Sequence, residues 1–221
     1  LRDTTLLDGI HNVNTTTALS QVRIGHSIAD FVMINGEGKV YEIKSDLDNF
    51  GRLKDQLSDY YRAFSKVSVL ASIHELENVK RVLSTLGNMG EAVGIYVLSE
   101  HDTIFNKERS REPKEFRSKL EHESIFKLLR KCEYDNVILQ CYGAVPKADP
   151  VFHFRVCLDK FKKIAILDAQ NLAFQELKKR NKITVEEFEK IQPELKSVVY
   201  FSRLVSKLPE LDKVLKTKYG R

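Results

Sequence analysis

The sequence predicts an α/β protein in which helices flank a mixed β-sheet and an α-helical region follows. Within residues 28–98, two β-prone runs around a turn are followed by helical and β-prone stretches in alternation, which is the order of a mixed sheet with right-handed crossovers. Beyond residue 113 almost every signal is helical. The 221-residue length suits one domain with a small helical appendage. We therefore expect a core over residues 1–100 and an α-helical subdomain over residues 113–221.

The first elements predicted are a short helix and a hairpin. Residues 1–22 are rich in Thr and Asn around a small apolar patch, and predict a short helix followed by a loop. The β-prone runs 28–34 and 39–44 flank an Asn/Gly-rich turn, the usual signature of a β-hairpin. If the turn is centred on Gly36, the pairing of the strands places Asp30 directly opposite Glu42.

The rest of the core is predicted as alternating helices and strands. Residues 50–64 carry apolar side chains every three or four positions, which is the period of an amphipathic helix. Residues 67–71 predict a strand, and residues 74–86 predict a second helix that ends at Gly87. The apolar run 93–98 predicts the last strand.

The C-terminal half is predicted as helices joined by one loop. Residues 99–113 are charged and lack apolar periodicity, which predicts a boundary. Residues 114–131 and 156–181 each show an apolar stripe at helical spacing, whereas residues 133–150 contain Gly and Pro and predict a loop. Thr184, followed three positions later by Glu, predicts a capping box that opens a short helix.

Composition excludes several classes of protein. With 42% hydrophobic and 30% charged residues, 10 Gly and 5 Pro, the chain is neither collagen-like nor low-complexity and disordered. Its apolar runs are all shorter than the ~18 residues that cross a bilayer, so we expect no membrane insertion and a cytoplasmic location. Three cysteines without a CxxC pair, Cys132, Cys141 and Cys157, argue against a disulfide framework or a zinc ribbon and predict ordinary buried thiols.

Positive charge gathers in the second half of the chain. Residues 101–221 hold 26 Lys and Arg against 18 Asp and Glu, within a net charge of +5 for the whole chain. Such an excess attracts a polyanion, although a solvated, lysine-rich helix surface has the same composition. The candidate nucleic-acid-binding residues are Lys162, Lys163, Lys178, Lys179 and Arg180.

The hairpin carries the residues with the clearest chemistry. Asp30 and Glu42, if opposed, have Cβ atoms about 4.5–5.5 Å apart, close enough to bind one cation. Lys44 lies two residues beyond Glu42 and projects from the same face of the strand. Two opposed carboxylates repel each other unless a positive charge lies between them, and a divalent metal ion supplies that charge.

Mg²⁺, or Mn²⁺ in its place, is the expected cofactor. Mg²⁺ prefers carboxylate oxygens and keeps several waters, so Asp30, Glu42 and the main-chain carbonyl of Ile43 would leave room for water and a phosphate. The metal would lower the pKa of a bound water, and Lys44 would position or deprotonate that water.

These residues resemble a known enzyme motif. Asp30 and the run Glu42-Ile43-Lys44 on a hairpin, followed by a helix with Gln56 and Tyr60 four residues apart, resemble the PD-(D/E)xK nuclease superfamily. More narrowly, they resemble a little-characterised bacterial and phage branch of it. The resemblance implies a restriction-endonuclease-like core that hydrolyses phosphodiester bonds in nucleic acid, with DNA as the expected substrate. It also implies that Gln56 and Tyr60 lie beside the metal site.

Two departures from that motif are visible. Many members carry an upstream acid, for which Asp3 and Asp8 are the nearby candidates, and Ala29 occupies the position of the superfamily's proline. Asp46 and Asp48 are interpreted as turn and cap residues rather than as ligands.

Two other functions stay open. The chain could be a catalytically inactive nucleic-acid-binding or regulatory module on the same fold, which the missing upstream acid favours. It could also be a helical partner-binding protein, such as a homodimer, in which the acids of the hairpin are incidental. Metal binding and turnover distinguish these alternatives from an enzyme.

Overall fold

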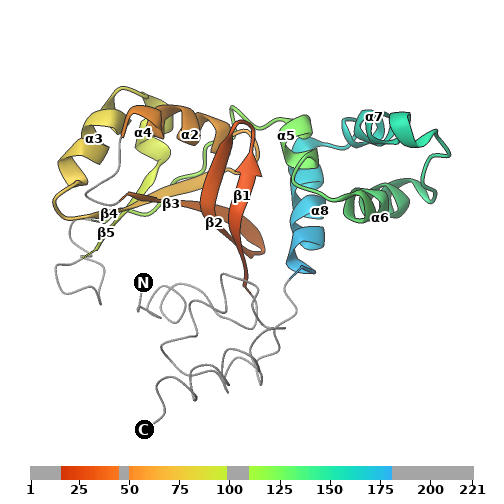
Figure 1. Ribbon diagram of the computed structural model, residues 1–221, viewed down its shortest axis with the longest axis horizontal. Helices are drawn as coiled ribbons and strands as arrows, with labels where there is room; N and C mark the ends of the chain where they lie inside the picture. The colour runs from red at the N-terminus through yellow and green to blue at the C-terminus, as the bar shows by residue number, and fades with distance from the viewer. Residues whose placement is uncertain (1–15, 45–49, 99–109, 181–221) are drawn as a thin grey trace, which may run out of the picture.

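A computed structural model describes residues 16–44, 50–98 and 110–180, and confirms a mixed sheet with flanking helices and a helical region after it (Figure 1). Five strands lie in the sheet in the order in which they occur in the chain. The first three are antiparallel neighbours, and the third, fourth and fifth are parallel. The strands are β1 (Thr17–Ile24), β2 (Ser27–Asn35), β3 (Glu37–Lys44), β4 (Lys66–Ser72) and β5 (Gly94–Leu98).

The hairpin of β2 and β3 has the predicted register over most of its length. Its ladder runs from the pair of Phe31 with Tyr41 to the pair of Asn35 with Glu37, on either side of Gly36. Gly36 has a φ of +73°, a conformation that a residue with a Cβ adopts only with strain. The turn chemistry and the strand alternation therefore agree on one register.

Strand β1 was not predicted. The structure shows Thr17–Ile24 as an edge strand of the sheet, where the sequence predicted a short helix and a loop. The strand buries Leu19 and Ile24 but exposes Gln21 and Arg23, so its polar residues hide the alternation that would identify it. Residues 1–15 lie outside the described part of the chain.

Helices cover one face of the sheet (Figure 1). The predicted helix over 50–64 is a 3₁₀ turn, η1 (Phe50–Arg52), followed by α2 (Leu53–Tyr60). The helix predicted over 74–86 is α3 (Leu76–Ser84), and α4 (Asn88–Ala92) follows it as an additional short helix.

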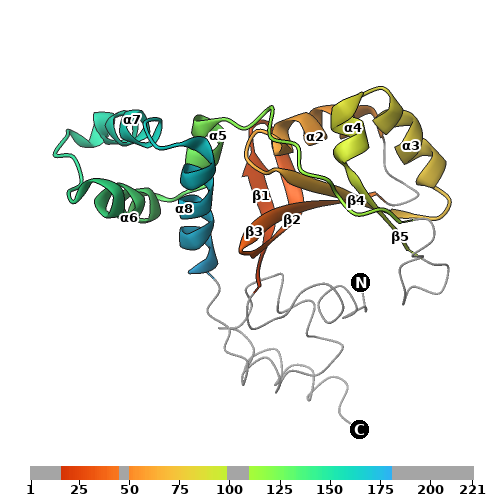
Figure 2. The same cartoon turned by 180° about the vertical axis from the view of Figure 1, so that it is seen from behind.

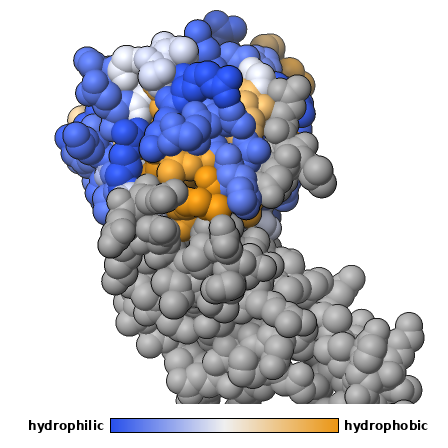
Figure 3. Space-filling view, turned by 90° about the vertical axis from the view of Figure 1, so that its left-hand side faces the viewer, coloured by the Kyte–Doolittle hydropathy of each residue, from blue (hydrophilic) through white to orange (hydrophobic). Residues whose placement is uncertain are grey.

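Helix α3 shows why this layer forms. Leu76, Val79 and Leu83 are buried, whereas Lys80 and Arg81 on the other side of the helix are exposed. Burial of one apolar stripe is the main stabilisation that a helix this short receives. The side of the molecule on which α3 lies is mostly hydrophilic, although one apolar patch interrupts it (Figure 3).

The helical region differs from the prediction in its boundaries. The helix expected over 114–131 is confined to α5 (His122–Phe126). The segment before it is not helical because the Phe116 amide donates to the Ser65 carbonyl and the Phe116 ring packs edge-on against Tyr61, at 5.1 Å between centroids. These tertiary contacts replace the hydrogen bonds of a helix.

The predicted loop over 133–150 is also wrong. It holds most of α6 (Lys131–Tyr142), which ends at Gly143 in the left-handed conformation, and α7 (Pro150–Phe161) begins where the loop was expected to end. Gly and Pro mark a helix end and a helix start here rather than a long loop. A break before α8 (Ile166–Lys178) divides the helix predicted over 156–181. The capping box at Thr184 lies outside the described residues.

Helix α8 attaches the helical region to the sheet (Figure 2). Phe174 stacks on Phe64 at 5.2 Å, and the Gln170 side chain donates to the Ala63 carbonyl over 2.7 Å. A Cβ on Gly38 of β3 would lie 2.6 Å from the Phe174 ring, so this glycine allows the close approach. The region therefore shares the hydrophobic core of the sheet.

Candidate functional site

A polar cluster lies on β2 and β3, on the face of the sheet that α2 covers. Glu42 and Lys44 alternate with Tyr41 and Ile43 on β3 and are only 3% and 7% exposed. Burying a carboxylate and an ammonium group costs free energy unless both are paired and hydrogen-bonded. The cluster therefore has to satisfy its charges internally.

Both oxygens of the Glu42 carboxylate accept hydrogen bonds. Oε1 accepts from Lys44 Nζ at 3.0 Å and from Gln56 Nε2 at 2.6 Å. Oε2 accepts from the Tyr60 hydroxyl at 2.6 Å, and Lys44 Nζ also donates to Gln56 Oε1 at 3.1 Å. Gln56 and Tyr60 come from one face of α2, as their spacing of four residues predicted. Four of the predicted site residues thus form one network.

Asp30 lies beside this network but not in the predicted ladder pair with Glu42. The β2–β3 ladder ends at the pair of Phe31 with Tyr41, one position short of Asp30. The Asp30 carboxylate instead accepts a hydrogen bond from the main-chain amide of Ile43 at 2.8 Å. The ladder to β1 also skips Asp30, opposite Gln21, whose φ of +51° is rare for a residue with a Cβ. The sheet is therefore irregular on both sides of Asp30, and backbone strain of this kind is frequent at functional sites.

Burial shifts the titration of the cluster. Desolvation raises the pKa of Glu42, the hydrogen bond from Tyr60 and the charge of Lys44 oppose that rise, and the nearby Asp30 adds to it. The pKa of Tyr60 is raised by burial and by the Glu42 charge, so its hydroxyl stays protonated and donates. Tyr60 and Lys44 thus both favour the ionised form of Glu42 against the effect of burial.

The cluster has capacity left for a cation. A carboxylate offers about four lone-pair sites, and Glu42 uses three of them. Asp30 uses Oδ2 for Ile43, and no described residue donates to its Oδ1. Oxygen ligands of this kind suit Mg²⁺, so the donor chemistry fits the predicted cofactor. The predicted role of the Ile43 carbonyl as a ligand stays a prediction.

An open hollow of about 610 Å³ borders the cluster. Its walls are the turn between β1 and β2, with His26 at the rim, and one side of η1 and α2. Gln56 belongs both to this wall and to the Glu42 network, so the hollow reaches the cluster through that side chain. The full lining is His26, Ser27, Ile28, Arg52, Asp55, Gln56, Ser58 and Asp59.

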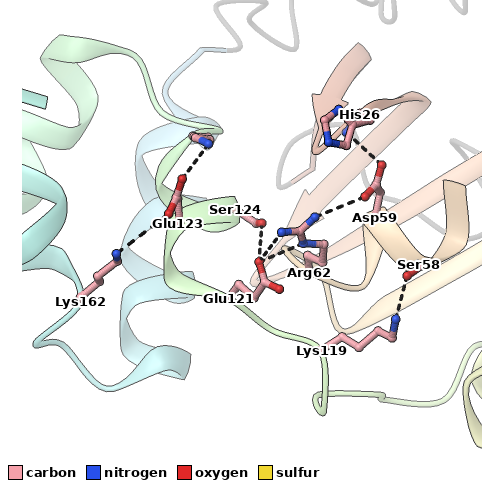
Figure 4. A network of polar contacts seen from close by, with 10 residues as sticks. His26, Ser58, Asp59, Arg62, Lys119, Glu121, Glu123, Ser124 and Lys162 are labelled. Atoms are coloured by element: carbon pink, nitrogen blue, oxygen red, sulfur yellow. Dashed lines mark hydrogen bonds and ion pairs between the residues drawn. The ribbon is translucent and has the colours of Figure 1, made fainter. Parts of the chain in front are cut away.

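A seam of charged side chains runs from this hollow to the helical region (Figure 4). Asp59 accepts the amide of His26 at 2.9 Å and pairs with Arg62 at 3.6 Å. Arg62 also pairs with Glu121 at 2.8 Å, and Glu123 then pairs with Lys127 and Lys162. We call these cations, together with the exposed Lys163 that follows Lys162 in the chain, the basic seam: Arg62, Lys119, Lys127, Lys162 and Lys163.

The residues predicted to bind nucleic acid do not form one patch. Lys162 and Lys163 are exposed before the start of α8, whereas Lys178 to Arg180 lie at its other end, about 20 Å away at 1.5 Å per residue. Lys179 pairs with Glu176, and Arg180 is committed to Glu133 and to the Leu128 carbonyl. Their role in nucleic-acid binding stays a prediction.

Sequence reasoning missed a second cluster. Asp135 on α6 meets His153 and Cys157 on α7, whose spacing of four residues was an available signal. The expectation of three buried thiols is wrong, since Cys132 and Cys141 are exposed and Cys157 alone is buried.

Four further acids that the sequence offered near the hairpin motif lie outside the described residues: Asp3, Asp8, Asp46 and Asp48. Exposed apolar side chains gather on α7, where Val151 is 80% and Phe152 60% exposed, but the predicted homodimer stays a prediction.

Comparison with known proteins corrects the resemblance. The family model of Bacteriophage P4 protein cII matches residues 4–198. Assignment to the PD-(D/E)xK nucleases is therefore wrong: that motif is a short string of common residues on a hairpin, whereas the match extends over most of the chain. No curated protein and no solved structure matches. Among the described helices, none combines the length and the apolar character needed to span a membrane.

Proposed function

Because the chain belongs to the bacteriophage P4 protein cII family, we propose that it is a cytoplasmic phage regulatory protein that acts by binding nucleic acid, with DNA as the first candidate. The observation that carries this proposal is the basic seam, which connects the helical region to the hollow beside β2 (Figure 4). A phosphate backbone needs exposed cations along a line, and the seam supplies them across two parts of the fold.

The charge balance of the seam favours an anionic ligand. Three of its five cations, Arg62, Lys127 and Lys162, pair with the carboxylates of Asp59, Glu121 and Glu123. Lys119 donates to the Ser58 hydroxyl, and Lys163 makes no ion pair with a described residue. The charge of Lys127 and of Lys162 helps to lower the pKa of Glu123, so that carboxylate is ionised and shared between cations at neutral pH.

Binding is tested with a fluorescently labelled DNA duplex and with single-stranded DNA and RNA over a series of salt concentrations. We expect the affinity to fall steeply with salt, with a log–log slope of about −0.9 for each duplex phosphate contacted. The double variant Lys162→Glu/Lys163→Glu should lower the magnitude of that slope by about 2 and weaken binding about tenfold or more.

The matched control is Lys80→Glu/Arg81→Glu, which reverses two exposed charges on α3, away from the seam. It should bind like the wild type. Salt-independent binding, or equal losses in both double variants, would refute the seam as the binding surface.

A second candidate function is metal-dependent hydrolysis of phosphodiester bonds. The grouping of Asp30, Glu42 and Lys44 beside an open hollow favours it, because a buried charged cluster gives little stability for its cost. Asp30 Oδ1 and the remaining lone pair of Glu42 Oε2 would hold Mg²⁺. When bound, the ion lowers the pKa of a water ligand and stabilises charge on phosphate oxygens. Gln56 and Tyr60 hold Glu42 in place, and Lys44 would orient the attacking water.

Turnover is tested on linear, nicked, branched and single-stranded substrates with Mg²⁺, Mn²⁺ or EDTA. If the wild type is active, Asp30→Asn should abolish both cleavage and thermal stabilisation by Mg²⁺. Asp55→Asn, an exposed acid of the same hollow, is the control and should keep both. DNA binding without cleavage under all conditions supports the regulatory function and eliminates the hydrolase.

A further inference from the structure

A cluster of three different metal-binding side chains joins α6 to α7 and shares no residue with the basic seam. His153 and Cys157 are each more than nine-tenths buried, and Asp135 faces them from α6 with 19% of its side chain exposed. The carboxylate Oδ1, the imidazole Nε2 and the thiol Sγ lie within 4.8 Å of one another. Three donors from two helices thus converge on one point.

The geometry is unlike that of a nucleophile relay. In a Cys–His–Asp relay the two ring nitrogens have separate partners, one facing the thiol and the other the carboxylate. Here the same nitrogen, Nε2 of His153, lies 2.6 Å from Asp135 Oδ1 and 3.5 Å from Cys157 Sγ. Contacts that share one nitrogen suit a central ion, because each donor then points at the same position.

The distances are close to those of a tetrahedral zinc site. Typical Zn–N, Zn–O and Zn–S bond lengths give separations of about 3.6 Å for N···S, about 3.6 Å for O···S and about 3.4 Å for N···O. The structure has 3.5 Å between His153 Nε2 and Cys157 Sγ, and 3.8 Å between Cys157 Sγ and Asp135 Oδ1. His153 Nε2 and Asp135 Oδ1 form a hydrogen bond of 2.6 Å in the structure. To bind one metal ion together, these two atoms must move apart by about 0.8 Å.

We propose that Asp135, His153 and Cys157 form a binding site for Zn²⁺ or a similar transition-metal ion, with water in the fourth position. Thiolate and imidazole ligands select Zn²⁺, Co²⁺ and related ions over Mg²⁺, so this site differs in its chemistry from the oxygen cluster on β2 and β3. A thiolate and a carboxylate neutralise the charge of the divalent ion.

The surroundings support metal entry and orientation. Lys131 Nζ pairs with the other carboxylate oxygen of Asp135 at 2.8 Å, which fixes Oδ1 toward the two α7 residues, as outer partners of metal ligands do. The exposed part of Asp135 gives the ion a path to the buried thiol. Once bound, the ion would cross-link α6 and α7 on either side of the connection between them.

Cobalt is the direct probe, because a thiolate bound to Co²⁺ gives a charge-transfer band and tetrahedral Co²⁺ gives intense visible bands. The full chain, purified without a histidine tag and stripped of metal, should bind Co²⁺ and show both. Zn²⁺ should displace the cobalt and bleach the bands, and Mg²⁺ should not. No uptake by the wild type, or uptake without the charge-transfer band, would overturn the proposal.

Substitutions locate the site. Replacing even an outer partner of a metal ligand typically costs about 10- to 100-fold in affinity, so Cys157→Ser and His153→Gln should each cost at least that. Cys141→Ser, an exposed cysteine of α6, and Asp30→Asn on the sheet should leave the spectrum unchanged. Circular dichroism of the metal-free variants shows which of them fold. Only the Co²⁺ titrations of the folded variants are used to locate the site. A band that survives in folded Cys157→Ser would place the metal elsewhere.

Discussion

Lys44→Met removes the cation from a buried network and leaves its anion in place. Lys44 Nζ lies 3.0 Å from Glu42 Oε1, and both side chains are almost fully buried. Breaking a buried ion pair from one side typically costs about 3–5 kcal/mol. Gln56 and Tyr60 still donate to the carboxylate, each keeping about 1 kcal/mol, so we expect the lower end, about 3 kcal/mol at pH 8.

The loss should depend on pH in a defined direction. Burial raises the pKa of Glu42 above 4.5 in the folded protein, and the charge of Lys44 restrains that rise. Between 4.5 and the raised pKa, the folded protein binds more protons than the unfolded chain, so the contribution of this group to stability falls as pH increases. Without the charge of Lys44, the pKa of Glu42 rises further. The variant's deficit should therefore be smaller at pH 5 than at pH 8.

Urea unfolding at both pH values measures these quantities. The double variant Glu42→Gln/Lys44→Met removes both charges and should recover most of the stability lost at pH 8. Lys80→Met, which removes an exposed ammonium from α3, should change stability by no more than about 0.5 kcal/mol. A deficit below about 1 kcal/mol, or an equal deficit at the two pH values, would refute the assignment of Glu42 as a buried anion that depends on Lys44.

Three further substitutions test the packing around the site and in the helical region, each by thermal unfolding. Tyr60→Phe removes a hydroxyl that donates to the buried Glu42 carboxylate and also lies 3.0 Å from the Ile28 carbonyl, and should cost about 1–3 kcal/mol. Tyr142→Phe, whose hydroxyl bond is exposed, should cost less. Arg180→Met removes the charge that lowers the pKa of Glu133 on α6, where burial alone would raise it. Its cost, about 2–3 kcal/mol at pH 7, should shrink as the pH falls below 4.5, through the lowered pKa at which Glu133 takes up a proton in the folded protein. Gly38→Ala places a Cβ 2.6 Å from the Phe174 ring and should cost about 1–3 kcal/mol, and a neutral result would show that α8 can move away.

Local signals in the sequence determined the centre of the sheet and most of the polar network. Alternation and a glycine turn specified the register of the hairpin, because shifting it by one residue would turn every apolar side chain to the other face. Helical spacing placed Gln56 and Tyr60 on one side of α2, whereas only the resemblance to a nuclease motif implied that this side lies beside Glu42. The strand register and the helical spacing both follow from short-range rules of backbone geometry, which act wherever the pattern is strong.

Only the tertiary structure decided the features that depend on distant contacts. The β2–β3 ladder stops at Asp30 because its carboxylate takes the Ile43 amide, and no periodicity encodes that exchange. The basic seam and the Asp135 cluster each join side chains from separate elements, whose packing is set by the burial of large apolar surfaces. Local periodicity fixes which face of an element is apolar, but the partner of that face depends on the whole chain.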